Sequence, residues 1–169
     1  MGKRIICFIF MLIGIVPFVS AATDQFFFEL NGGVWFYPGV GAKVGWMRFW
    51  NNERIGFVGD VSYYNNGFVD EMEGDWREEI KNAHNFGLAA GIVFNNMGFN
   101  GVLRTSQHIK IKGVLSIWDK PSLAPGLDIG VKLNLFFIEK TALSAGIGLD
   151  MVYFMPYPYI SLGMTFTKG

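Results

Sequence analysis

The sequence predicts an all-β protein, an eight-stranded antiparallel up-and-down β-barrel that spans a membrane. Two observations carry the prediction: apolar residues occupy every second position in several segments, and a secretory signal is followed by no long apolar run. Apolar residues at every second position indicate strands, because successive side chains of a strand point to opposite faces. A chain with 51% hydrophobic residues but no helical span is typical of a β-barrel.

The N-terminal segment predicts export. Two basic residues precede an apolar stretch over residues 5–18, and small residues follow. This pattern is typical of a secretory signal peptide cleaved after Ala21 or Ala22. We therefore expect a cleaved signal over residues 1–21 and a single barrel domain over residues 22–169. A retained membrane anchor is the alternative, because the apolar stretch is borderline in length for a spanning helix.

Composition excludes several classes of site. The only cysteine, Cys7, lies in the predicted signal, so the mature chain has neither a disulfide scaffold nor a thiolate metal site. The chain has 14 basic and 14 acidic residues, and this balance argues against a nucleic-acid partner.

The first half of the mature chain is expected to form four strands. Turns or loops are predicted at Tyr37–Gly39, Asn51–Arg54, Asn65–Asn85 and Asn95–Gly98, where polar residues, glycine or proline interrupt the alternation. The apolar faces of the four strands consist of Phe26, Phe28, Leu30, Val34 and Phe36; Val40, Ala42, Val44 and Trp46; Ile55, Phe57, Val61 and Tyr63; and Phe86, Leu88, Ala90, Ile92 and Phe94.

The segment from Phe99 to Trp118 has three interpretations: one long strand, a strand preceded by a loop, or a hairpin. A single strand there gives eight strands in all, whereas a hairpin broken near Thr105–Gln107 gives nine. Bacterial single-chain barrels normally have even numbers of strands, which favours the single strand. Asp119–Pro125 is then expected to be a loop.

The last three strands show the clearest alternation. Ile138–Thr141 is predicted to join the first to the second, and Pro156–Pro158 to join the second to the third. Each strand is about long enough to cross a bilayer when tilted, which takes roughly 9–11 residues. Their apolar faces consist of Leu127, Ile129, Val131, Leu133, Leu135 and Phe137; Leu143, Ala145, Ile147, Leu149, Met151 and Tyr153; and Ile160, Leu162, Met164 and Phe166.

Side-chain volume decides which face points outward. One face of each strand is bulky and apolar, and the other carries glycine, small polar residues and single charges. The interior of an eight-stranded barrel is just wide enough for side chains to fill, so the bulky faces would overfill it. We therefore expect the bulky faces to contact lipid. A soluble two-sheet sandwich, which can absorb more bulk, is the alternative.

Connection lengths predict the topology. With the N-terminus in the periplasm, the short connections Asn51–Arg54, Asn95–Gly98 and Ile138–Thr141 lie on the periplasmic side. The longer segments Asn65–Asn85 and Asp119–Pro125 lie outside, as expected of outer-membrane barrels. A short helix is conceivable over residues 76–83. The residues singled out in the external loop are Asp70, Glu71, Glu73, Asp75 and Trp76.

The signal, the alternating spans and the loop asymmetry together resemble the small eight-stranded outer-membrane barrels of the OmpX, OmpA barrel-domain and OmpW types. The resemblance covers the whole mature chain and is architectural. It implies a barrel assembled by the outer-membrane assembly machinery, which reads a terminal aromatic residue in those families. Gly163–Phe166 is similar to that ending, but Thr167–Gly169 follow it here.

One polar constellation is predicted in the lumen. Alternate positions of a strand face the same side, and this parity of residue number places four acidic and four basic residues on the inward face. Equal numbers of both signs are what a paired internal network requires, since an unpaired buried charge is costly. Phe136, Trp35 and Trp118 add bulk there. His84 and His108 have no metal-ligand spacing around them, so a zinc site is not expected. The predicted network residues are Glu29, Lys43, Asp60, Lys110, Lys112, Asp128, Lys132 and Asp150.

These features predict an integral protein of the outer membrane of a diderm bacterium with a structural or surface-interaction role and a plugged lumen. A narrow channel for small or hydrophobic solutes, as OmpW-type barrels suggest by resemblance, is the alternative. An enzyme is not expected, because no catalytic partner is evident for either histidine. No cofactor is expected. The expected partners are outer-membrane lipid, the barrel assembly machinery and a host or surface ligand bound through the loops. The barrel is expected to be a monomer.

Overall fold

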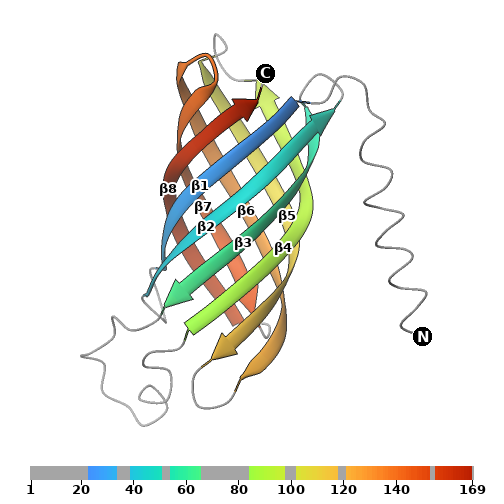
Figure 1. The fold of residues 1–169 in the computed structure, drawn as a ribbon, viewed down its shortest axis with the longest axis vertical. Coiled ribbons are helices and arrows are strands. Elements are labelled where there is room, and N and C mark those ends of the chain that lie inside the picture. Colours follow the sequence, from blue (N-terminus) through green and yellow to red (C-terminus); the bar gives the residue numbers. More distant parts are fainter. Residues whose placement is uncertain are drawn as a thin grey trace, which may run out of the picture.

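The computed structural model is a closed barrel of eight antiparallel strands, in which each strand pairs with the next and β8 closes on β1 (Figure 1). The structure describes residues 23–33, 39–50, 54–65, 84–97, 102–117, 121–152 and 155–168. Within these ranges, no helix is long and apolar enough to cross a membrane. The predicted fold class, an eight-stranded antiparallel up-and-down barrel, is confirmed. The strands are β1 Thr23–Gly33, β2 Gly39–Trp50, β3 Ile55–Asn65, β4 His84–Met97, β5 Leu103–Ile117, β6 Ser122–Ile138, β7 Thr141–Val152 and β8 Met155–Lys168.

The ambiguous segment contains one strand, β5. The predicted break near Thr105–Gln107 is absent, because Thr105 lies opposite Asn96 of β4 and Leu133 of β6 in continuous ladders. Ser106 is buried and Gln107 is exposed, so the alternation of faces also continues through this point. The single-strand interpretation is therefore confirmed, and the nine-strand alternative is wrong.

Six strands extend into segments that the sequence analysis assigned to connections. The extensions are Gly39 in β2, Asn65 in β3, His84–Asn85 and Asn95–Met97 in β4, Ser122–Pro125 and Ile138 in β6, Thr141 in β7 and Pro156–Pro158 in β8. These predictions are wrong because backbone pairing continues beyond the last apolar residue of a strand, where polar residues pair as well as apolar ones. Proline is tolerated near a strand end with one unpaired side. Within the described residues, β8 pairs with β1 only from Tyr159 onward.

The two faces of the barrel wall differ as predicted. The outward residues Val44, Ile111 and Leu162 are 59, 74 and 66% exposed. The inward residues of the same strands include buried charges, serines and glycines. The outer surface is therefore an apolar belt around a largely polar interior.

Part of the interior is apolar, which corrects the expectation of a small and polar inward face. Phe27, Met47, Phe49, Val58 and Val93 form a buried cluster, here called the apolar lumen cluster. It lies toward the end where β1 begins and β8 ends, here called the proximal end; the opposite end is called distal. Phe136 has intermediate exposure, whereas Trp35 and Trp118 lie outside the described residues.

Inward aromatic rings explain several of the lumen glycines. A Cβ on Gly148 would lie 2.5 Å from the Tyr159 ring, and one on Gly56 would lie 2.7 Å from the Phe49 ring. The Phe27 ring lies against Gly45 in the same way. Only a residue without a side chain allows this close approach, so each glycine provides the space that an aromatic ring occupies.

Candidate functional site: a charged network in the lumen

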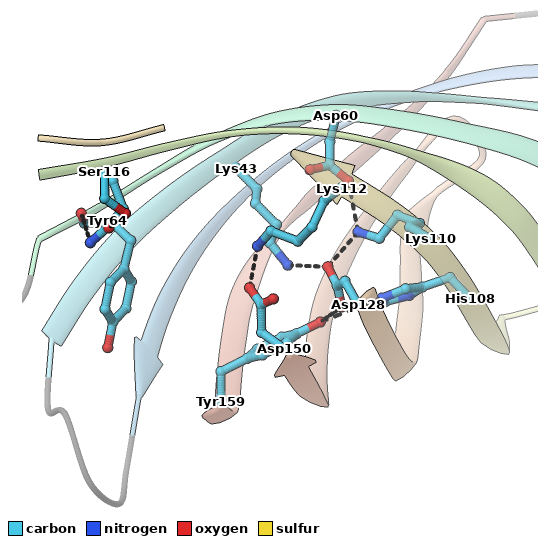
Figure 2. Close-up of polar contacts among 11 residues, drawn as sticks. Lys43, Asp60, Tyr64, His108, Lys110, Lys112, Ser116, Asp128, Asp150 and Tyr159 are labelled. Carbon is cyan, nitrogen blue, oxygen red and sulfur yellow. Dashed lines mark hydrogen bonds and ion pairs between the residues drawn. The ribbon is translucent and has the colours of Figure 1, made fainter. Parts of the chain in front are cut away.

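Six strands supply the charged residues of the lumen. All eight predicted network residues face the interior and form ion pairs there. Figure 2 shows the group around Asp128, without Glu29 and Lys132. The register sets their depth: Glu29 lies opposite Lys43, Lys110 opposite Asp128, and Asp128 opposite Asp150. The charges therefore share neighbouring levels of the barrel wall and can reach one another across the lumen.

Asp128 of β6 is the centre of this network. Its side chain is 1% exposed and lies 2.8 Å from the ammonium groups of both Lys43 and Lys110. It also accepts a hydrogen bond of 2.8 Å from the Tyr159 hydroxyl, and the Nε2 atom of His108 lies 3.1 Å away. A buried carboxylate surrounded by charge-assisted hydrogen bonds is far more stable than an isolated one.

The remaining charges are paired on either side of Asp128. Lys110 bridges Asp128 to Asp60, whose carboxylate lies 2.7 Å from the ammonium group. Lys112 pairs with Asp150 at the distal side of the centre. These contacts join β2, β3, β5, β6, β7 and β8 across the interior.

Lys132 and Glu29 form a separate pair on the proximal side. The Lys132 ammonium also lies 4.1 Å from the centroid of the Phe27 ring. A cation close to an aromatic face is stabilised by the ring quadrupole. This lysine therefore links the charged network to the apolar lumen cluster.

The sequence analysis missed two members of the network, His108 and Tyr159. His108 was considered without a partner, although its position shares the inward parity of Lys110 and Lys112. Tyr159 shares the inward parity of Ser161, but it followed a segment interpreted as a turn. Both contacts with Asp128 depend on register between strands, which residue parity does not contain.

A chain of hydrogen bonds continues the polar side of the lumen toward the proximal end. The Asn134 amide donates to Ser106, and the Ser144 hydroxyl donates to the Asn134 oxygen. Ser144 also lies 2.9 Å from the hydroxyl of Thr165. All four side chains are buried, so this half of the barrel interior is packed beside the apolar lumen cluster.

Other predicted features fall elsewhere. His84 lies on the outward face beside Tyr63 and is not part of the lumen network. The residues of the predicted external loop, Asp70, Glu71, Glu73, Asp75 and Trp76, lie outside the described residues, as do the predicted signal and the conceivable helix over residues 76–83.

The chemistry available in the lumen is ion pairing. Within the described strands, no group of three or more His, Cys, Asp or Glu side chains is arranged to hold a metal ion. Lysine ammonium groups pair with the carboxylates instead. The arrangement ties opposite walls of the barrel together.

Comparison with known proteins identifies the fold. No family model and no curated protein matches the sequence. A major outer membrane protein of Thermus thermophilus matches with a TM-score of 0.60 and 12% identity, over 88% of this chain and 100% of that one. Neisserial surface protein A matches with a TM-score of 0.57 and 10% identity, over 86 and 94% of the two chains.

Ail, the attachment invasion locus protein of Yersinia pestis, also matches in its complex with the heparin analogue sucrose octasulfate. The TM-score is 0.55 and the identity 12%, over 87% of this chain and 97% of that one. At such identities the likeness concerns the fold, which is that of the small eight-stranded outer-membrane barrels.

Proposed function

We propose that this chain is an integral outer-membrane β-barrel of a diderm bacterium, with a closed lumen and a non-enzymatic structural or surface-interaction role. The belt of exposed apolar residues supports membrane residence, because a water-soluble surface rarely carries a contiguous apolar area of this extent. The predicted signal peptide supports export, and N-terminal sequencing of the mature protein should begin after Ala21 or Ala22.

The ion-pair network centred on Asp128 is the observation that best supports the proposal of a closed lumen. Eight strands leave little interior beyond the volume of the side chains. Lys43 and Lys110 converge on Asp128 from β2 and β5, and the apolar lumen cluster and the hydrogen-bond chain fill the proximal side. Water and ions would pass only if several buried pairs separated together.

Planar-bilayer recording tests the closed lumen. Purified, refolded protein should show no stable ohmic conductance, and Asp128→Ala should raise the frequency of leak events, because Lys43 loses the carboxylate that holds it. Gln107→Ala, on the outward face, is the matched control and should leave the current unchanged. A steady, large conductance from the unmodified protein would refute the closed lumen.

A narrow channel is the second candidate. The charged network and the hydrogen-bond chain form a polar column along one side of the lumen, and such a column would line a path for small solutes once the lysines moved. The same recordings decide between the candidates. Mass spectrometry of lipid A from cells with and without the protein tests the non-enzymatic role, which predicts identical spectra.

If the protein has a surface-interaction role, we expect the host or surface ligand to bind at the distal end. The segment that joins β3 to β4 is long and acidic in sequence, and exposed loops commonly carry binding function on rigid scaffolds. A membrane-impermeant maleimide should label a cysteine at Gly74 in intact cells and spare one at Asn52. The reverse result would invert the proposed topology.

A further inference from the structure

Three polar side chains form a hydrogen-bonded group on the outward face at the distal end. His84 begins β4 and lies opposite Asn65, the last residue of β3. The Tyr63 hydroxyl lies 2.8 Å from the Nδ1 atom of His84. The Nδ2 atom of Asn65 lies 3.3 Å from both of these atoms. We call Tyr63, Asn65 and His84 the rim trio.

The outward residues of β3 and β4 change in character toward this end. Val61 and Leu88 are aliphatic and 60 and 69% exposed. One outward position nearer the distal end on each strand, Tyr63 and Phe86 form an aromatic pair with ring centroids 5.2 Å apart. The rim trio completes the series. Aliphatic, aromatic and polar residues in this order follow the hydrocarbon, interfacial and headgroup layers of a bilayer, so the trio lies at headgroup depth.

The hydrogen bonds of the rim trio leave one donor directed away from the group. Donation from Asn65 Nδ2 to the Tyr63 hydroxyl, and from that hydroxyl to Nδ1 of His84, gives each side chain a partner within the trio. The remaining ring proton of His84 is then on Nε2. None of the described residues pairs with Nε2. The ring is also stacked on Tyr63 with an interplanar angle of 27°, which fixes the direction of this N–H.

The opposite rim shows how the chain satisfies an outward cation when it supplies the anion itself. At the proximal end, Arg48 donates through Nε and Nη2 to the two carboxylate oxygens of Asp24, at 2.9 and 3.0 Å. Trp46 donates to the same carboxylate at 3.1 Å. No carboxylate of the described residues forms an ion pair with His84. The described strands therefore supply no acceptor for the Nε2–H group of His84.

We propose that the rim trio binds the phosphate of a lipid headgroup, with Nε2 of His84 donating to a phosphate oxygen. A phosphate oxygen is a strong acceptor and is present at the depth where the trio lies. The inference rests on the proposed membrane residence, because it requires the outward face to contact lipid. It adds one specific contact between this chain and its bilayer.

Solid-state magnetic resonance can test the contact directly, because the chain has only 2 histidines. Protein with ¹⁵N-labelled histidine rings, refolded into phosphatidylglycerol bilayers, should show ³¹P-induced dephasing of His84 Nε2. His108 lies in the lumen and should show none, so it is an internal reference. His84→Gln assigns the signals, because it removes those of His84 and leaves those of His108.

Two variants and one change of lipid separate the explanations. Tyr63→Phe removes the hydroxyl that orients the ring and should weaken the dephasing of His84, whereas Asn96→Ala, outward at the other rim, should leave it unchanged. In bilayers of phosphate-free galactolipid the dephasing should be lost. If inorganic phosphate restores it there, the ligand is free phosphate and the lipid assignment is overturned.

The remaining outcomes distinguish this inference from the proposed function. Folding is followed by the heat-dependent shift of the band in gel electrophoresis and by circular dichroism. A folded, inserted barrel without dephasing at His84 would overturn the lipid contact alone. A chain that gave no shifted band and no β signal would overturn both the contact and the membrane barrel.

Discussion

Replacing Asp128 with asparagine should destabilise the barrel strongly. The substitution keeps the size of the side chain and one of its two acceptor oxygens, but it removes the charge between Lys43 and Lys110. Lys110 retains Asp60, whereas Asp128 is the only described carboxylate within ion-pair distance of Lys43. The variant therefore leaves one buried ammonium group without a counter-charge.

The expected loss is about 3–5 kcal/mol in the free energy of unfolding, which is the usual effect of removing one partner from a buried pair. Two charges 2.8 Å apart attract each other by about 6 kcal/mol at an effective dielectric constant of about 20. Part of this attraction is offset when water or a neighbouring carboxylate solvates Lys43. Urea unfolding in lipid vesicles, followed by tryptophan fluorescence, measures the change.

Asp24→Asn is the matched control. Asp24 also pairs with a cation, but the side chain of that cation, Arg48, is 25% exposed, against 5% for Lys43. Water can solvate the cation that this variant leaves behind, so the expected loss is about 1 kcal/mol. A second substitution, Lys43→Met, should recover most of the loss caused by Asp128→Asn. Equal losses for the two aspartates, or no recovery in the double variant, would refute the assignment of Asp128 as the centre of the network.

Two further predictions test the two faces of the barrel wall. Ile147→Arg, in the middle of β7, should make the free energy of insertion about 2–4 kcal/mol less favourable, whereas Ile138→Arg, at a strand end, should change it by about 0–1 kcal/mol. Equal insertion yields for the two variants would mean that the outward face does not contact lipid. Gly148→Val should lower the free energy of unfolding by about 1–3 kcal/mol, because its Cβ would meet the Tyr159 ring. Gly113→Ala has open space around the new Cβ and should unfold at the same urea concentration as the unmodified chain.

Alternation in the sequence was sufficient to predict the strands and their faces, because it depends only on neighbouring residues. Ile111 and Lys110 lie on opposite sides of β5 as their parity requires. Strand ends were predicted poorly where proline or polar residues pair through their backbones, as Pro156 does with Met151. These residues carry no apolar signal, although their main chains complete the ladder.

Partners within the lumen could not be predicted from parity. Parity assigns Lys132 to the inward face but contains no information about depth, which depends on register and strand tilt. The structure pairs Lys132 with Glu29 of β1 rather than with its sequence neighbour Asp128. The apolar lumen cluster was missed for a related reason: the space for Phe49 depends on Gly56, which becomes its neighbour only after β2 and β3 have paired.

The Asp128 network also bears on how the barrel unfolds. Lys43 and Asp128 are 85 residues apart in the sequence, and Tyr159 joins them from the last strand. Contacts of such long range form only when the sheet has nearly closed, since the chain must first lose the entropy of many loops. Interactions that form after the transition state slow unfolding more than they accelerate folding. The network should therefore prolong the lifetime of an assembled barrel while contributing little to the rate at which the strands first come together.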